Sequence, residues 1–272
     1  MFERSSESYR RAIFFARYAS SEYGSPTIES EHLLLGVLKE DSKMVQHFLE
    51  PPGTIEGIEK EIEAQSKMGK RFAASAELPL SAEAKRILLF SAEEADRLDH
   101  EQIGTEHLLL GILREEKCLA ARILGGHGVK PGAVREGVAE GAEKARIGQV
   151  VDELLGAWKK RDAGKVTGFF GEHGQFWDGH GERWMGRAEI KKGVEGELAL
   201  FGKSAGGGDV KDVKFVGMDA AVVTIAWEAK AGLKKRGASG LRMVVLMARG
   251  NQGWCVDSAH LAEIRAVRRS KS

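Results

Sequence analysis

The chain has 272 residues and is almost neutral, with 41 lysines and arginines against 40 aspartates and glutamates. This balance hides two unlike halves: residues 1–142 carry 18 basic and 24 acidic side chains, net −6, and residues 143–272 carry 23 and 16, net +7. All five prolines and all three tyrosines precede residue 132, whereas all five tryptophans follow residue 157. A chain of this length can bury two separate cores. We therefore expect two domains, residues 1–141 and 142–272.

The same composition disfavours membrane and secreted proteins. The sequence has no apolar run of 18 residues, the length that a membrane-spanning helix requires. The first residues lack the architecture of a secretory signal peptide. The two cysteines, Cys118 and Cys255, fall one in each expected domain and form neither a disulfide framework nor a CxxC pair. We expect a cytoplasmic protein with no membrane partner.

The first half predicts helices in two matching sets. Helical spacing of apolar residues predicts a first helix over residues 7–23 and its counterpart over 84–98. The other helices are also predicted in pairs, one in each set. The second helices start at residues 30 and 105, the third cover 45–49 and 120–124, and the fourth cover 55–64 and 133–142. The segment between the sets, residues 66–80, has few apolar anchors and predicts a loop. The expected fold is all-α, with a four-helix unit at about 1–65 and another at about 81–141.

A repeated sequence supports this pairing. Residues 28–40 read IESEHLLLGVLKE, and residues 103–115 read IGTEHLLLGILRE, 75 positions later. The same offset aligns Arg11 with Arg86. A register that persists through otherwise different sequence indicates a duplicated structural unit.

The two copies, with Phe2-Glu3-Arg4 ahead of the first, resemble the Clp repeat domain at the N-terminus of Clp-type AAA+ protein unfoldases. The resemblance covers residues 1–141. In those proteins the domain is a docking platform for adaptors and substrates. The resemblance therefore implies a protein partner from a Clp-type proteolysis or chaperone system.

The starts of the repeated helices are candidates for partner docking. Ser30 and Thr105 are predicted to be helix N-caps, because each hydroxyl can accept a hydrogen bond from a free backbone N–H. The resemblance implies that the next residues, Glu31 and Glu106, recognise phosphorylated arginine as in some Clp proteins. A purely structural role at the helix start is the alternative. The first copy departs from the family pattern at Glu29, where glycine is usual, so the second copy is the better candidate.

Two kinds of chemistry are not expected in this protein. No carboxylate or second histidine follows His32 or His107 at ligand spacing, so we expect structural histidines and no metal. A Clp ATPase would contain GxxxxGK[ST], but Gly202-Lys203-Ser204 follows a glutamate, Glu197, where the first glycine is needed. We expect no ATPase activity and no cofactor.

The second half predicts helices followed by strands. Predicted helices cover residues 146–161, 166–170 and 188–200, and predicted strands cover 175–178, 210–216, 220–229, 240–248 and 253–261. This order is typical of an α+β cone, in which a curved antiparallel sheet wraps helices.

This half is similar to the SnoaL-like, nuclear transport factor 2-like superfamily. The similarity lies in Val151–Trp158, Phe176-Trp177-Asp178, Gly186–Ile190 and Ser258-Ala259-His260. It implies an open cup that binds a small hydrophobic molecule, or a domain that forms homodimers through the outer face of the sheet.

The candidate lining of the cup is aromatic, with one histidine: Trp158, Phe170, Phe176, Trp177, Trp184, Trp227, Trp254 and His260. Ordinary core packing is the alternative for each, because aromatic side chains supply large apolar areas in any core. Asp178, His180 and His260 form the one plausible acid–base set. Asp178 and His180 lie in a glycine-flanked loop, where solvated polar residues are expected, so the sequence favours a protein that is not an enzyme.

Together these features predict a non-ATPase accessory protein with a docking domain and a ligand-binding or dimerising module. One alternative is a SnoaL-like enzyme that acts on a small hydrophobic molecule, with the Clp domain as a localisation tag. Another is an inert structural fusion that dimerises.

Basic segments such as Lys234-Lys235-Arg236 do not alternate with aromatic residues, so no nucleic-acid partner is expected.

Overall fold

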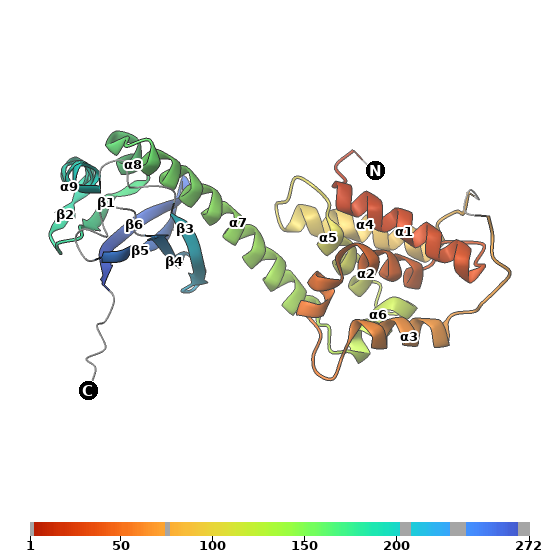
Figure 1. Cartoon of the computed structure of the whole chain (residues 1–272). Helices are drawn as coiled ribbons and strands as arrows, with labels where there is room; N and C mark the ends of the chain where they lie inside the picture. Colours follow the sequence, from red (N-terminus) through yellow and green to blue (C-terminus); the bar gives the residue numbers. More distant parts are fainter. Residues whose placement is uncertain (1–2, 74–76, 202–207, 229–237, 266–272) are drawn as a thin grey trace, which may run out of the picture. The chain divides into compact units, whose positions relative to one another are not determined.

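The computed structural model describes residues 3–73, 77–201, 208–228 and 238–265 (Figure 1). The chain divides into two compact units, Met1–Gly141 and Ala142–Ser272. No helix in the described ranges is long and apolar enough to cross a membrane. Two segments singled out in the sequence, Gly202-Lys203-Ser204 and Lys234-Lys235-Arg236, lie outside the described residues.

The first unit confirms the duplicated all-α fold. Its helices are α1 (Glu7–Tyr23), α2 (Ser30–His47), α3 (Ile55–Gln65), α4 (Ala82–Arg97), α5 (Thr105–Arg114), α6 (Leu119–Gly126) and the start of α7 (Pro131–Lys159). In the first copy, two predicted helices merge into α2 across a kink at Asp41, where φ is −145° and ψ is 65°. The Asp41 carboxylate accepts a hydrogen bond from the N–H of Met44 and so starts the second segment. The second copy keeps these two helices apart as α5 and α6.

The predicted N-caps are wrong by one residue. The capping positions are Glu29 and Gly104, and Ser30 and Thr105 are the first helical residues. A histidine side chain closes each helix start: Nδ1 of the third helical residue accepts the N–H of the capping residue, at 3.0 Å in the first copy and 2.8 Å in the second. This bond satisfies one N–H at each helix start and explains why both copies contain Glu-His.

The two copies are interlocked by backbone pairing. Ser5, which lies ahead of α1, forms a parallel bridge with Ile103 of the second copy, and Leu80, which lies ahead of α4, forms the equivalent bridge with Ile28 of the first copy. The N–H groups of Ile103 and Ile28 each donate across the bridge at 2.8 Å. Because both bridges obey the 75-residue offset, the domain has an approximate twofold relation between its halves.

The glycine of the repeated sequence permits close helix packing. A Cβ atom on Gly36 would collide with the carbonyl oxygen of Ala12 in α1, and one on Gly111 would collide with that of Ile87 in α4. The leucines beside these glycines form the centre of the core, and each is 0% exposed: Leu33, Leu34, Leu108 and Leu109. The α1–α2 and α4–α5 pairs are therefore fixed by equivalent contacts.

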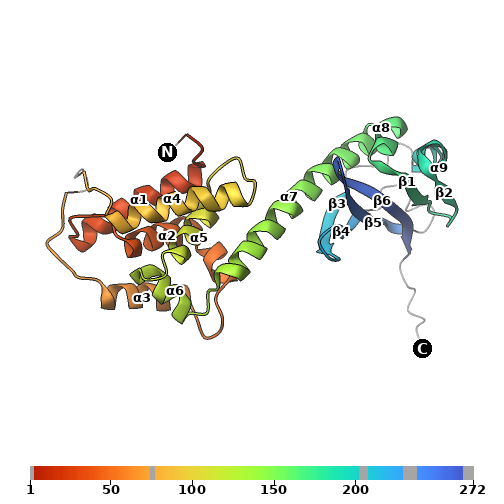
Figure 2. The ribbon, with the colours of Figure 1, turned by 180° about the vertical axis from the view of Figure 1, so that it is seen from behind.

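The second unit is an α+β cone. Its elements are the remainder of α7, α8 (Ala163–Gly168), β1 (Phe170–Trp177), β2 (Arg183–Met185), α9 (Gly186–Phe201), β3 (Asp209–Phe215), β4 (Ala220–Glu228), β5 (Ala238–Gly250) and β6 (Gly253–Arg265). The strands form one sheet in the order β2-β1-β6-β5-β4-β3, which can be followed in Figures 1 and 2. The predicted four-strand antiparallel meander is present as β3 to β6. The pairing of β1 with β6 is parallel, so the sheet as a whole is mixed.

The core of this unit lies between the helices and one face of the sheet. Ile147 and Val151 of α7 pack there with Val194 of α9 and with alternate residues of the central strands, such as Val223 and Val245. Strand residues alternate between the two faces of a sheet. The other face is therefore lined by the residues between these positions, a point that matters for the predicted cup.

Candidate functional sites

The two hydroxyl residues predicted to take part in docking are buried. Ser30 is 0% exposed and Thr105 is 3% exposed. The hydroxyl oxygen of Ser30 lies 3.5 Å from the backbone nitrogen of Ala120, which belongs to the opposite copy. Because both residues are buried, a partner cannot reach these hydroxyls, and this part of the predicted site is wrong.

The two glutamates remain accessible, but they are held differently. The Glu106 side chain is 33% exposed, and its Oε1 lies 3.3 Å from Nδ1 of His107. Its carboxylate lies over Gly104, where a Cβ atom would overlap it. In the first copy the equivalent position is Glu29, whose side chain takes that space. Glu31 instead accepts a hydrogen bond from the Ser30 hydroxyl at 3.3 Å, and burial raises the pKa of its carboxyl group.

Glu31 lines a pocket of about 440 Å³ at the start of α2. His32 also lines the pocket and is buried, and its Nε2 has no hydrogen-bond partner. Burial lowers the pKa of His32 to about 4, so the ring is neutral at pH 7. Because Nδ1 accepts the Glu29 N–H, the neutral ring carries its proton on Nε2.

At the start of α5, the structure brings together three groups that the sequence did not connect. Ligand atoms of His100, Glu106 and His107 all lie within 4.8 Å of one another. His107 accepts the Gly104 N–H at Nδ1, so its proton lies on Nε2, which is 2.9 Å from Nδ1 of His100. A metal ion on Nε2 of His107 would require this proton to leave or to move to Nδ1, which would break the helix cap. The hydrogen bonds therefore favour a structural role for the pair.

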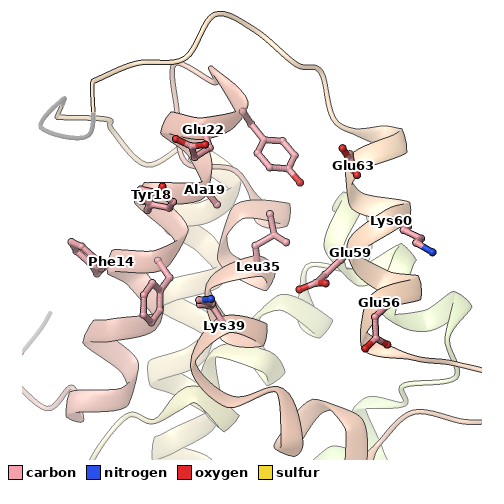
Figure 3. A pocket seen from close by; sticks show the side chains of 12 residues that line it. Phe14, Tyr18, Ala19, Glu22, Leu35, Lys39, Glu56, Glu59, Lys60 and Glu63 are labelled. Carbon is pink, nitrogen blue, oxygen red and sulfur yellow. The ribbon is translucent and has the colours of Figure 1, made fainter.

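A further cavity in the first copy has no counterpart among the predicted sites. It has a volume of about 770 Å³ and lies among α1, α2 and α3 (Figure 3). Its α1 side is aromatic, and Phe14 and Tyr18 there are 63% and 52% exposed. The spacing of these two residues, one helical turn apart on the outward face of α1, is the sequence signal that could have revealed it.

In the second unit, Asp178 has a structural role. Its Oδ1 accepts the N–H groups of His180 and Glu182, both at 2.9 Å, and its Oδ2 accepts the indole N–H of Trp184 at 3.2 Å. The carboxylate therefore holds the turn between β1 and β2. His180 is exposed beyond this turn. These contacts do not form the predicted acid–base set.

The predicted cup lining divides between the two faces of the sheet. Five of its members belong to the buried core: Trp158, Phe170, Phe176, Trp227 and Trp254. Trp184 packs half-buried against that core. Trp177 and His260, by contrast, stack on the outer face with ring centroids 3.9 Å apart. Phe176 and Trp177 are consecutive strand residues and must point to opposite faces, so including both in one lining was wrong.

The geometry defines a duplicated helical repeat domain followed by an α+β cone. Residues 4–127 and 80–153 match the Clp repeat (R) N-terminal domain family. Together the matches span residues 4–153, more than half of the chain. The chain therefore belongs to this family.

The relatives of the first half are Clp proteins. The chain is 37% identical over 136 residues to the ATP-dependent Clp protease ATP-binding subunit ClpA homolog, chloroplastic, of Brassica napus. The aligned region covers 50% of this chain and 15% of the relative. Chaperone protein ClpC1, chloroplastic, of Oryza sativa subsp. japonica gives the same identity and coverage. The chain thus spans only about 15% of the length of these relatives.

Among solved structures, the chain is similar to the N-terminal domain of the chaperone ClpD from Arabidopsis thaliana, with 24% identity and a TM-score of 0.40, over 53% of this chain and 97% of that one. It is also similar to an NTF-2 like protein from Shewanella oneidensis MR-1, with 18% identity and a TM-score of 0.35, over 44% and 98%.

Proposed function

We propose that this protein is a non-ATPase accessory factor whose Clp repeat domain docks a protein partner, adaptor or substrate of a Clp-type system. The observation that carries the proposal is a complete duplicated repeat in which the Glu106 carboxylate stays accessible at a helix start. The acidic charge of residues 1–142 favours a basic partner.

Glu106 is the proposed recognition group. A carboxylate can accept two parallel N–H bonds from a guanidinium group, and this geometry gives arginine recognition its strength. The glycine at position 104 leaves room for the carboxylate, whereas Glu29 brings a second negative charge close to Glu31 in the first copy. An arginine or phosphoarginine side chain of the partner is therefore proposed to bind at the second copy.

Calorimetric titration of the full-length protein with free arginine and free phosphoarginine tests this proposal. Glu106→Ala should weaken the better ligand by about 1.5–3 kcal/mol, the range for a hydrogen bond to a charged group, and should leave the melting temperature almost unchanged. Glu106→Gln separates charge from shape, and Glu31→Ala is the matched change in the first copy. A lower melting temperature with unchanged binding would assign Glu106 to the fold alone.

We propose that the second unit is a dimerising module and that the protein is cytoplasmic. Binding of a small ligand is the alternative function of this unit. The outer face of the sheet supports dimerisation, because Trp177, His260 and Val244 lie side by side there and Val244 is 38% exposed. Sedimentation equilibrium should show a dimer that Val244→Lys dissociates. A monomeric wild-type protein would rule out dimerisation through this unit. The alternative of a SnoaL-like enzyme has no support from Asp178, because its carboxylate holds a turn.

A further inference from the structure

The cavity among α1, α2 and α3, here called the α1–α3 groove, combines an apolar floor with an acidic wall. Phe14 and Tyr18 project from α1, and Leu35 contributes from α2 (Figure 3). Aromatic side chains exposed to this degree lose the free energy that burial would provide. They form an apolar patch in a concave surface, which is the usual setting of a protein contact.

The wall of the groove on α3 is negatively charged. Glu56, Glu59 and Glu63 follow one another at helical spacing and line the groove. Within the described part of the chain, none of the three forms an ion pair. Figure 3 shows Glu59 directed from α3 toward α2, while Lys60 points away from the groove. Burial, together with the carboxylates of Glu63 and Glu59, raises the pKa of the neighbouring Tyr23.

In the second copy, ion pairs join the helices around the equivalent space. Glu94 of α4 is 0% exposed and accepts two hydrogen bonds from Arg135 of α7, at 2.8 and 3.1 Å. Arg114 of α5 lies over the ring of Phe90, 4.3 Å from its centroid, and pairs with Glu93 at 2.7 Å. These ion pairs tie α4, α5 and α7 together.

The first copy keeps Phe15 and Lys39 at the positions of Phe90 and Arg114, but it lacks the carboxylates and the arginine that form this closure. The 75-residue offset places Ala19 at the position of Glu94 and Tyr18 at that of Glu93. Between α3 and the start of α7 the offset is 76, because Ile58 and Val134 occupy equivalent buried positions. With this offset, Glu59 is the counterpart of Arg135. A buried carboxylate with its arginine is thus replaced by a methyl group facing a glutamate. The groove is open because both halves of the bridge are missing.

We propose that the α1–α3 groove binds an amphipathic helix of a partner protein, whose apolar face covers Phe14, Tyr18 and Leu35 and whose basic side chains pair with the glutamates of α3. A helix in a groove of this kind places apolar anchors at every third or fourth residue. The occupant is basic because four glutamates line the groove against two lysines, and three of these glutamates share one wall and form no ion pair within the described residues. Neither Glu31 nor Glu106 lines this groove, which extends the docking function to a second contact.

The probe is a labelled synthetic helix of about 18 residues, or roughly five turns, with leucines along one face and arginines beside them. Fluorescence anisotropy with the full-length protein should show saturable binding in the micromolar range. A second helix, with every arginine replaced by glutamate, should not bind. Replacing Glu59 and Glu63 together by lysine should weaken the basic helix about tenfold and permit binding of the acidic one.

A designed closure gives the sharpest variant. Ala19→Glu combined with Glu59→Arg transfers the bridge of the second copy into the first and should abolish binding of the basic helix. The matched pair Phe14→Ser and Leu89→Ser changes equivalent exposed positions of the two copies, since Leu89 is 49% exposed. Only Phe14→Ser should weaken binding. Far-ultraviolet circular dichroism and the melting temperature confirm that each variant is folded.

Several results would overturn the inference. One is equal binding of the basic and acidic helices, and another is basic-helix binding that the closure variant leaves unchanged. Failure of the basic helix to bind would also reject it. A dimer that dissociates when the groove is closed would assign the groove to a second copy of the chain. The Glu106 titrations are independent of all these outcomes, so the two docking proposals can fail separately.

Discussion

Acidification should destabilise the first unit through the two capping histidines. His32 is 1% exposed and His107 is 0% exposed, and burial lowers the pKa of each from 6.5 to about 4. Glu29 opposes this shift at His32, and Glu94 opposes it at His107, where His100 and Arg4 act in the same direction as burial. Both rings are therefore neutral in the folded protein at pH 7, and each accepts its capping hydrogen bond only in that form.

The direction of the effect follows from the two pKa values. The unfolded chain takes up protons near pH 6.5, whereas the folded chain resists them until about pH 4. The histidines thus contribute their full stability above pH 6.5 and lose it as the pH falls toward 4. A pKa shift of this size corresponds to a change of about 3 kcal/mol in the free energy of unfolding for each histidine. Between pH 7 and pH 5 the loss should be about 2 kcal/mol per ring, or about 4 kcal/mol for the pair.

Urea denaturation at pH 7 and pH 5 measures this loss. Ellipticity at 222 nm follows mainly the helices of the first unit, while tryptophan fluorescence follows only the second, which contains all five tryptophans. The variant His32→Gln/His107→Gln is the matched control, because a glutamine at the third helical position can accept the capping N–H without titrating. Its stability should change little between the two pH values. An equal loss in this variant and the wild type would refute the assignment to the histidines.

Three other predictions test the fold. Leu109→Ala should lower the free energy of unfolding by about 2–5 kcal/mol in urea denaturation, since Leu109 is 0% exposed, and a negligible change would contradict its central position. Gly111→Ala should cost about 1–3 kcal/mol in the same assay because its Cβ atom would meet the backbone of α4; an exposed position such as Gly125, which has open space, is the control. Residues 1–141 alone should show a cooperative thermal melt by circular dichroism, and an unfolded fragment would show that the two units share a core.

The helices of the first unit could be predicted because their apolar periodicity is strong and occurs twice. The caps could not be predicted from the usual rule. Ser30 and Thr105 have the favoured residue types, but the bond that closes each helix comes from a histidine ring three residues after the capping position. Hydroxyls are the common caps, and a ring nitrogen in this position becomes visible only when its geometry is known.

The second unit shows a different limit. The meander could be predicted because its strands are consecutive and separated by turn residues. The parallel contact between β1 and β6 joins strands that are far apart in sequence, so no turn signal marks it. The predicted lining contained Phe176 and Trp177 because both are aromatic. The alternation of strand residues, applied to these two positions, would have placed Trp177 and its neighbour His260 on the outer face.

The groove depends on differences between the copies rather than on any motif. The repeated sequence drew attention to the positions that the copies share, whereas the groove arises where they differ, at Ala19 against Glu94 and Glu59 against Arg135. The second difference is hidden in a simple alignment because the offset changes from 75 to 76 after α6. A comparison that followed the buried positions would have detected it.

The two copies have diverged at both candidate contact surfaces, and in complementary directions. The second copy keeps Gly104, so Glu106 has room at its helix start, and it seals its groove with Glu94 and Arg135. The first copy crowds its helix start with Glu29 and leaves its groove open. Because the shared leucine core and the interlocking bridges hold both copies in the same fold, each copy can change its surface without losing its structure. The duplication therefore provides one scaffold with two different surfaces, as the two docking proposals together require.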